Sequence, residues 1–475
     1  MKELIAHPAI LPLIPLFGII FLLFVFQLVN RRKSLGYLIE KNALILLIFM
    51  ICGVTITPFN KFTPLALIER EKTLPSLAAQ IVLYLSTVFV LLPRLRFTLQ
   101  KIIAAFYSIV IFNPGFCALV LLIVLSGFWS ATPDYTFKNA GILLGTTIVL
   151  IYIAKQYDIQ QFAELIRLNN TWIAIPSIYY SLFRKSIGIN ATKNSWQGIL
   201  AHPNPLGSLM ALNIFLWGVY AARNPKDRKK AFTIIFISLY VLQMAGTAGA
   251  KVQLILLTCL LLFVNSIKPL PFQWTFTGIV VFLILAIIGT ILVTENLETI
   301  VVDGLGKDMT FTGRVPVWNM LFTEHIPKHP WFGFGYHGFW QPWRGLDNPA
   351  FNVIVMPSEW RPPHAHNGFV DTIVDLGFFG GLAFAISFIT NLIYAVVYLS
   401  QKKGSEAALP LIFLTYVVIT NLSEGGLIEV SMTWVLYATT TLRLSMEMSY
   451  LIKSQKPPKR LVTQPTLEAN RMDSL

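Results

Sequence analysis

Runs of about 20 apolar residues recur along almost the whole of this 475-residue chain, with short polar segments between them. A helix of that length crosses the ~30 Å hydrocarbon core of a bilayer. The chain is 55% hydrophobic and only 13% charged, which excludes a soluble globular fold. The sequence therefore predicts an all-α integral membrane protein.

The apolar runs predict about 12–13 transmembrane helices. The predicted spans are 9–29, 36–57, 76–93, 102–129, 137–154, 171–188, 203–222, 230–248, 250–266, 272–294, 367–399, 407–423 and 430–450. Two of these runs, 102–129 and 367–399, are too long to lie wholly within the hydrocarbon. No small-residue cleavage site follows the first run, so we interpret that run as a retained helix and not as a signal peptide.

The net charge of +14 is distributed in clusters that fall on one side of the membrane when the spans are threaded alternately. The clusters are at 31–33, 94–101, 223–230, 402–403 and 453–460. This is the positive-inside pattern, so the charge needs no nucleic acid as a partner. It predicts a cytoplasmic C-terminus and places the polar segment 295–366 on the opposite, external face.

The same reading divides the chain into four regions. These are an N-terminal transmembrane region at 1–294, a large external loop at 295–366, a C-terminal transmembrane region at 367–452 and a disordered cytoplasmic tail at 453–475. Within the loop, residues 315–326 have apolar positions at helical spacing, which predicts an amphipathic helix lying on the bilayer. Glycines alternate with aromatic residues at 329–340, a composition that favours the headgroup level.

The strongest candidate site is the polar cluster where the loop enters the next span. It consists of His364, His366, Asn367, Asp371 and Asp375. Ionisable groups in a membrane segment are costly and indicate a functional site. Two carboxylates lie on one helical stripe with the asparagine, which predicts a polar cavity beside them. The alternative interpretation is a helix cap with interhelical hydrogen bonds.

Cationic and polar residues elsewhere on the external face are further candidates. Arg314 precedes the amphipathic helix, and a guanidinium can bind a phosphate through two parallel hydrogen bonds. His202 and Asn204 begin an apolar run, where Asn204 is expected to cap the helix. Lys251 follows a hairpin of small residues whose simpler role is close helix packing. The sequence 129–136 reads as a structural turn at the interface.

Cofactor chemistry finds no support in the sequence. No phosphate-binding loop, dinucleotide fingerprint, zinc-ligand spacing or serine nucleophile elbow is present, so we predict no cofactor and no metal. The three cysteines, Cys52, Cys117 and Cys259, lie within apolar runs and are interpreted as small core residues.

Five segments, taken in order, resemble the O-antigen ligase and polymerase superfamily of bacterial envelope glycosyltransferases. They are LSGFWSATPDYT, GILAHPNPLG, FTGRVPVW, WFGFGYHGFW and HAHNGFVDTIVDLGFFGG. The last segment, with its His-Asn pair at the start of a helix, is the most specific. The Gly-aromatic segment ending in Phe-Trp and the doubled His-Ala-His-Asn are most similar to the exopolysaccharide polymerase branch.

The resemblance implies a GT-C-like fold and a metal-independent glycosyltransferase in the bacterial inner membrane, with its active site on the periplasmic side. Its donor would be a glycan on undecaprenyl pyrophosphate. His366 would orient or deprotonate the acceptor hydroxyl, and Arg314 with Lys251 would stabilise the leaving pyrophosphate. Relatives often carry Ser-Arg where this chain has Lys251, so Arg184 or Arg361 is an alternative phosphate ligand.

The leading hypothesis is a polymerase that joins lipid-linked repeats into an exopolysaccharide. A ligase that moves the glycan onto lipid A core or protein shares the donor and the residues, and a flippase of lipid-linked sugars is a third possibility. The expected partners are the lipid-linked glycan, an acceptor glycan and membrane lipid, with other polysaccharide export proteins as further candidates.

Overall fold

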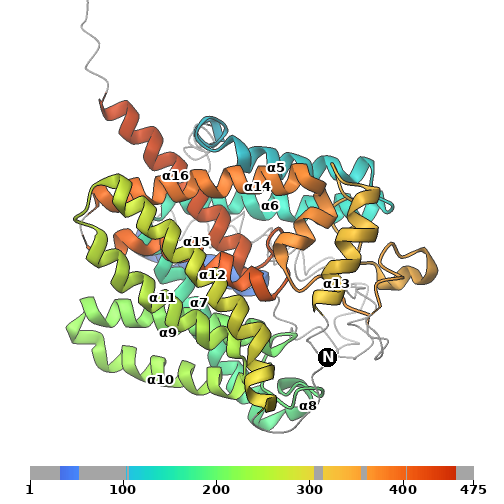
Figure 1. The fold of residues 1–475 in the computed structure, drawn as a ribbon. Helices are drawn as coiled ribbons and strands as arrows, with labels where there is room; N and C mark the ends of the chain where they lie inside the picture. The colour runs from blue at the N-terminus through green and yellow to red at the C-terminus, as the bar shows by residue number, and fades with distance from the viewer. Residues whose placement is uncertain are drawn as a thin grey trace, which may run out of the picture.

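A computed structural model describes residues 33–52, 103, 106–303, 314–354, 361–402 and 404–455 (Figure 1). Within these residues the fold is helical, and the only β-type pairing is an isolated bridge between Ile189 and Trp196. The prediction of an all-α fold is confirmed for this part of the chain. The predicted spans 9–29 and 76–93, and the tail after 455, lie outside the described residues.

The longer helices pack into one bundle. They are α3 (Lys33–Ile51), α5 (Pro114–Leu125), α6 (Pro133–Gln156), α7 (Ile159–Phe183), α9 (Pro203–Arg223), α10 (Arg228–Ala245), α11 (Ala248–Ile267), α12 (Phe272–Asp303), α14 (Gly368–Gln401), α15 (Leu409–Ser423) and α16 (Met432–Gln455). The short helices α8 (Lys185–Gly188) and α13 (Arg314–Met320) lie in the segments that connect them. α12 continues to Asp303, beyond the predicted end of its span at 294.

Among the described helices, six are long and apolar enough to cross a membrane. They are α6, α9, α11, the 272–291 part of α12, α14 and the 406–423 segment that contains α15. The apolar windows of α9 and α15 are 72% and 78% buried, whereas those of α11 and α12 are only 28% buried. α9 and α15 therefore form the interior of the bundle, and the predicted total of 12–13 spans stays a prediction.

Both of the overlong runs are broken. The first bends by 108° between 106–112 and 114–128. At the bend the side chain of Asn113 caps α5. Its Oδ1 accepts a hydrogen bond from the Phe116 backbone amide, and its Nδ2 donates to Asn391 Oδ1 at 2.9 Å. Pro114 at the first position of α5 cannot continue the preceding helix. The break explains how a run of this length fits the bundle.

The second break divides α14 at Gly377, whose φ is 65° and ψ −168°. The loop 330–337 fills the gap and pairs with the backbone groups that the break leaves free. The hydrogen bonds run from Phe334 N to Val374 O (3.0 Å), Gly335 N to Asp375 O (2.8 Å), Phe378 N to Pro330 O (2.8 Å) and Phe379 N to Trp331 O (3.2 Å). Non-helical backbone at membrane depth is tolerated only where protein satisfies it in this way.

The turn 126–136 holds the other side of this loop, as its structural interpretation predicted. Ser126 Oγ accepts from the Tyr336 amide at 2.9 Å, and Thr136 Oγ1 donates to the Tyr336 carbonyl at 2.9 Å. The Trp129 indole donates to the Phe332 carbonyl at 3.1 Å. The Gly-aromatic loop is thus fixed between α14 and the turn before α6.

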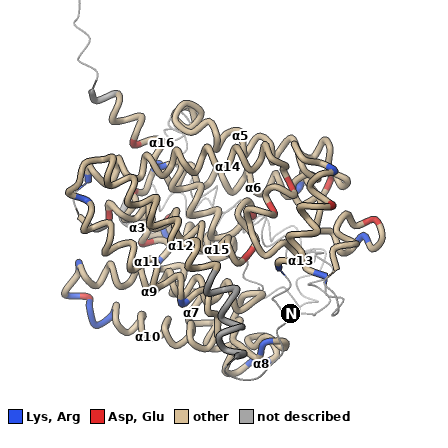
Figure 2. Tube along the Cα trace, in the orientation of Figure 1, with Lys and Arg blue, Asp and Glu red and all other residues tan. Residues whose placement is uncertain are grey.

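Charged residues gather at the two ends of the bundle. Figure 2 shows a blue run at the turn between α9 and α10, and both red and blue segments around α13 at the other end. At the first end Arg223 pairs with Glu406, and Lys268 Nζ donates to the Lys402 carbonyl at 2.7 Å. The predicted basic cluster 223–230 and Lys402 of the cluster 402–403 therefore share one end, as the predicted topology requires.

Candidate active site

The candidate site lies at the end of the bundle opposite these basic clusters, where four segments meet. The segment before α14 brings His364 and His366, and α13 begins at Arg314. α9 begins after His202, and Glu424 follows α15. These residues come from separate parts of the sequence and are joined by the contacts below.

The two histidines form one unit. Their ring centroids lie 4.1 Å apart, and the His366 amide donates to His364 Nδ1 at 3.0 Å. Because Nδ1 of His364 accepts, the proton of its neutral ring is on Nε2. His366 has a φ of 52°, in the left-handed region that costs a non-glycine residue roughly 1–2 kcal/mol. Such strain is typical of functional positions.

The start of α14 fixes the histidine turn, residues 364–366, at its C-terminal side. Asn367 caps the helix, accepting from the amides of Phe369 and Val370 at 3.0 and 3.2 Å, which confirms the capping interpretation. The Gly368 amide donates to the Glu424 carbonyl at 3.1 Å. A Cβ at Gly368 would overlap the Asn421 side chain. The turn is therefore held against the end of α15.

Asp371 connects the Gly-aromatic loop, residues 329–340, to α14. Its Oδ1 accepts from the Ala365 amide and from the Trp340 indole, both at 2.9 Å. The Trp318 indole donates to the Ala365 carbonyl at 2.8 Å. A Cβ on Gly425 would lie 2.9 Å from Asp371 Oδ2 and 3.1 Å from His364 Nδ1. The described contacts of Asp371 Oδ1 are thus structural. One of them fixes Ala365, the residue between His364 and His366 in the sequence.

Asp375, the second carboxylate of the predicted stripe, serves the same loop. It is 7% exposed, and its Oδ2 accepts from the His337 amide at 3.0 Å. Its Oδ1 has no hydrogen-bond partner among the described residues. Asp375 lies at the break in α14 and contacts the Gly-aromatic loop there.

His202, and not Asn204, caps α9. His202 Nδ1 accepts from the Asn204 amide at 3.3 Å, so the expectation that Asn204 is the cap was wrong. The side chain of Asn204 instead donates to Glu424 Oε1. A ring nitrogen can replace the usual capping oxygen because it is also an acceptor. Through Glu424 the start of α9 is joined to the end of α15.

Burial and nearby cations together determine the protonation of His366. They lower its pKa from 6.5 to about 3: burial has the largest effect, followed by the charges of His364, Arg314, His202 and Lys193 in that order. The pKa of His202 is also lowered, mainly by burial, against the opposing effect of Glu424. His366 is therefore neutral at neutral pH, with both Arg314 and Lys193 within electrostatic reach.

Comparison with known proteins identifies the segment that carries these residues. Residues 233–385 match the sequence model of the family described as O-antigen ligase. This segment is therefore similar to the O-antigen ligase family. The match confirms the resemblance to the O-antigen ligase and polymerase superfamily. A comparison with curated proteins finds no match.

The matched segment, residues 233–385, includes part of the candidate site. It contains Arg314, His364 and His366, whereas His202 and Glu424 lie before and after it. The site is therefore completed by helices outside the matched segment, through the contacts of Glu424 described above.

Two predicted site residues lie apart from these contacts. Lys251 is in the first turn of α11, where Gly207 of α9 lies close to Thr247 and Ala250. This close approach agrees with the packing role of the small-residue hairpin. Arg361 is exposed, and its guanidinium lies over the Phe351 ring at 4.2 Å from the centroid. Their roles in substrate binding stay predictions.

Glu424 is the residue that sequence reasoning missed. Its only signal was a carboxylate in the short external segment 423–429. With His364 and His366 it forms a group whose ligand atoms lie within 4.8 Å of one another. Two imidazoles and a carboxylate are a donor set that suits zinc. This triad is where a divalent metal would bind if this protein held one, and the prediction of a metal-free site stays a prediction.

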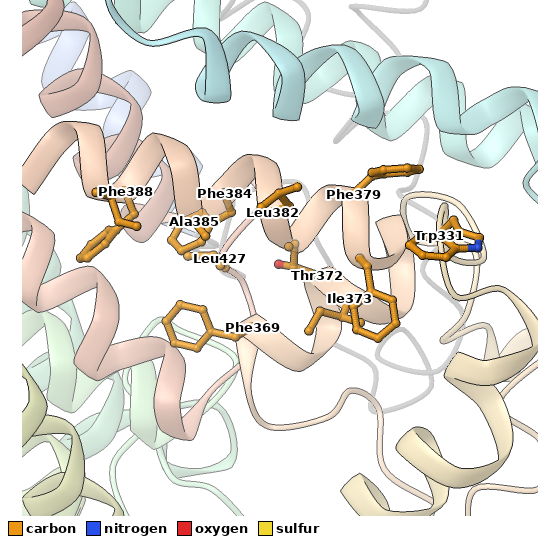
Figure 3. Close-up of a pocket in the computed structure, with 13 residues that line it drawn as sticks. Trp331, Phe369, Thr372, Ile373, Phe379, Leu382, Phe384, Ala385, Phe388 and Leu427 are labelled. Atoms are coloured by element: carbon orange, nitrogen blue, oxygen red, sulfur yellow. The ribbon is translucent and has the colours of Figure 1, made fainter.

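An apolar groove of about 650 Å³ follows α14 (Figure 3). Phe369 and Leu427 line it between Phe388 and Trp331 (Figure 3), and they are two and three residues along the chain from Asn367 and Glu424. The groove is lined by Trp331, Phe369, Thr372, Ile373, Phe378, Phe379, Gly381, Leu382, Phe384, Ala385, Phe388, Ile389 and Leu427. With one threonine among these residues, its surface suits a hydrocarbon chain.

Proposed function

We propose that this protein is a polymerase that joins undecaprenyl-pyrophosphate-linked oligosaccharide repeats at the periplasmic face of the inner membrane. The observation that carries the proposal is a neutral, strained histidine within electrostatic reach of cations, just before the helix that the apolar groove follows. The groove would receive the polyprenyl chain, and the cations the pyrophosphate. Few other substrates join a long hydrocarbon, a polyanion and a sugar in this order.

The leaving group would be stabilised by the cations beside His366. Arg314 can bind the pyrophosphate through two parallel hydrogen bonds, whereas Lys193 supplies a point charge. Fixed charges aimed at a developing negative charge are often the largest catalytic contribution. Lys251 and Arg361 make no hydrogen bond to the histidines or Glu424 among the described residues, so we assign them lesser roles in phosphate binding.

His366 would act on the acceptor. The acceptor hydroxyl oxygen forms a bond to the anomeric carbon of the donor, the bond from that carbon to the pyrophosphate oxygen breaks, and His366 accepts the hydroxyl proton. A pKa of about 3 makes the free imidazole a weak base. A bound pyrophosphate would neutralise the surrounding cations and raise the pKa of His366. The base would thus become effective only when the donor is in place.

The remaining assigned residues would bind or position substrate. His364 fixes the backbone of His366, and His202 and Asn204 form the opposite wall through Glu424. Asn367 and Asp371 hold the turn from which His366 projects. Sugar hydroxyls of the acceptor would bind between the turn that carries His366 and the start of α9.

The test is an assay with purified protein and one lipid-linked repeat as the only substrate. A ladder of longer products supports the polymerase. Addition of a chelator should leave the rate unchanged. Activity that is lost with chelator and restored by zinc would instead assign the triad of His364, His366 and Glu424 as a metal centre.

The second candidate is a ligase, which is as consistent with the family match as the polymerase is. It would share the donor, the groove and His366, and would differ only in its acceptor. No product from the single substrate, with transfer once a lipid A core acceptor is added, would support the ligase. Translocation of a labelled lipid-linked glycan across vesicles without chain growth would support a transporter and contradict both enzymes.

A further inference from the structure

A second polar cleft lies at the opposite end of the bundle from the histidines. It has a volume of about 360 Å³ and is formed by the start of α7, the end of α9 and the residues that precede α15. Its lining includes Gln160, Gln161, Glu164, Arg167, Asn224 and Glu406. Helix ends meet here at the end that carries the basic clusters, which is the level of lipid headgroups in a membrane protein.

Arg167 is the unusual residue of this cleft. The residue is only 9% exposed, and its guanidinium lies 3.7 Å from the ring centroid of Tyr220 and 4.5 Å from that of Trp217. Its Nε is buried with no hydrogen-bond partner among the described residues. The aromatic rings hold the guanidinium by its face, which leaves its N–H edge for another group.

The carboxylates that line the cleft already have cations. Glu164 pairs with Lys41 at 2.6 Å, and Glu406 pairs with Arg223. Gln160 also donates to Glu406. Arg167 therefore remains as a positive charge without a carboxylate at hydrogen-bonding distance within the part of the chain that the structure describes.

The other polar groups near Arg167 are engaged. Gln161 forms a capping box with Asp158, and Asn224 donates to the Tyr220 carbonyl at 2.9 Å. Asp227, which is exposed, accepts from the Tyr220 hydroxyl. These contacts build the walls of the cleft and leave the guanidinium of Arg167 as its unsatisfied donor.

We propose that this cleft binds a phosphate group through Arg167. A buried charge without a counter-ion costs several kcal/mol, and a phosphate offers two oxygens at the spacing of the guanidinium. The phosphate belongs either to the headgroup of an anionic lipid or to a free phosphate. The cleft is separate from the groove along α14, so the proposal does not depend on the polymerase or ligase reaction.

The experiment measures the thermal unfolding midpoint of the full chain. One series uses detergent with inorganic phosphate against chloride at equal ionic strength, and the other uses phosphatidylcholine nanodiscs with and without phosphatidic acid. A ligand that binds only the folded state raises the midpoint as its concentration rises. A response to inorganic phosphate identifies a free-anion site, whereas a response to phosphatidic acid alone identifies a headgroup site.

The variants are Arg167→Gln, Arg167→Lys and the control Lys229→Gln. Lys229 is exposed at the same end, so its loss changes the net charge equally without touching the cleft. The control should respond as the wild type does, and Arg167→Gln should lose the response. Arg167→Lys keeps the charge without the paired donors and should bind roughly tenfold more weakly.

Three results would overturn the proposal. One is a wild type that responds to neither phosphate source, and another is an Arg167→Gln protein that responds as strongly as the wild type. If Arg167→Gln does not fold, Arg167→Lys decides the question, because an affinity equal to that of the wild type would show that paired hydrogen bonds from Arg167 are not involved.

Discussion

The amide of His337 donates a 3.0 Å hydrogen bond to Oδ2 of Asp375, and this bond joins the Gly-aromatic loop to the broken helix α14. His337 itself has a φ of 55°, so the loop bends sharply to reach the carboxylate. Asp371, one turn earlier, accepts from Trp340 of the same loop. The two aspartates therefore fix the loop relative to the histidines, and the shape of the site depends on the break in α14.

Gly377→Ala should destabilise the protein strongly. The φ and ψ of Gly377 lie in a region that is essentially restricted to glycine, and a Cβ there would overlap the backbone of Trp331. We expect a loss of at least about 1–3 kcal/mol, measured as a lower thermal unfolding midpoint in detergent. Gly141→Ala in α6 is the control, because its Cβ would meet nothing within 4 Å. Equal effects of the two substitutions would contradict a special role for the break.

His366→Asn should abolish polymer formation while the protein still folds. Asparagine tolerates a positive φ, so the turn is kept while the imidazole is lost. General-base catalysis is typically worth about 10²–10⁴-fold, and the rate should fall by that factor. His364→Ala should retain measurable activity, since it removes only the acceptor for the His366 amide. The exposed His329, with His329→Asn, is a control, and full product length from His366→Asn would reduce the His-Asn pair to a helix cap.

Arg314→Lys should impair the reaction although it keeps the positive charge. Lysine cannot form the two parallel hydrogen bonds of a guanidinium with a phosphate. We expect a decrease of roughly tenfold in kcat/KM for the lipid-linked donor, corresponding to about 1.4 kcal/mol. Arg344→Lys elsewhere in the loop serves as a comparison, because Arg344 Nη1 contacts the Gln341 side chain. Wild-type kinetics for Arg314→Lys would show that charge alone suffices there.

The stability of the protein should fall in acid through His366. The pKa of this residue is about 3 in the folded protein and 6.5 in the free side chain. Between these values the unfolded chain binds a proton that the folded protein excludes, so stability is complete above pH 6.5 and decreases as the pH falls toward 3. The slope is at most about 1.4 kcal/mol per pH unit for this one group. Unfolding midpoints of the wild type and His366→Asn, compared at about pH 7 and about pH 5, should converge in acid. A parallel decrease in both proteins would contradict the lowered pKa.

The loop and the C-terminal end of α16 should lie on opposite sides of the membrane. In a chain whose three cysteines are replaced, Asp347→Cys should react with an impermeant thiol reagent in intact spheroplasts, and Ser454→Cys should react only after lysis. Asp347 is exposed on the loop, which makes its labelling depend on sidedness alone. Labelling of Ser454→Cys alone in intact spheroplasts would invert the topology and remove the periplasmic assignment of the site.

The sequence by itself determined the helical class of the fold, the cap at Asn367 and the location of the histidines at a helix entrance. These are local properties, because hydrophobic run length, capping side chains and polar residues in apolar surroundings act within a few turns of one helix. It also indicated that 102–129 and 367–399 could not be straight spans. It did not give the position or the form of either break.

Only the tertiary structure decided how distant segments meet. Glu424 joins the start of α9 and lies beside His364 and His366, a relationship that no spacing in the sequence encodes. The two aspartates of α14 accept donors from a loop more than thirty residues earlier in the chain, as the Trp340–Asp371 and His337–Asp375 separations of 31 and 38 positions record. The lowered pKa of His366 likewise arises from burial and from cations contributed by other segments. Burial and charge proximity are properties of the packed chain. The sequence indicated where the candidate site residues lie, and the packed structure decides their protonation and their partners.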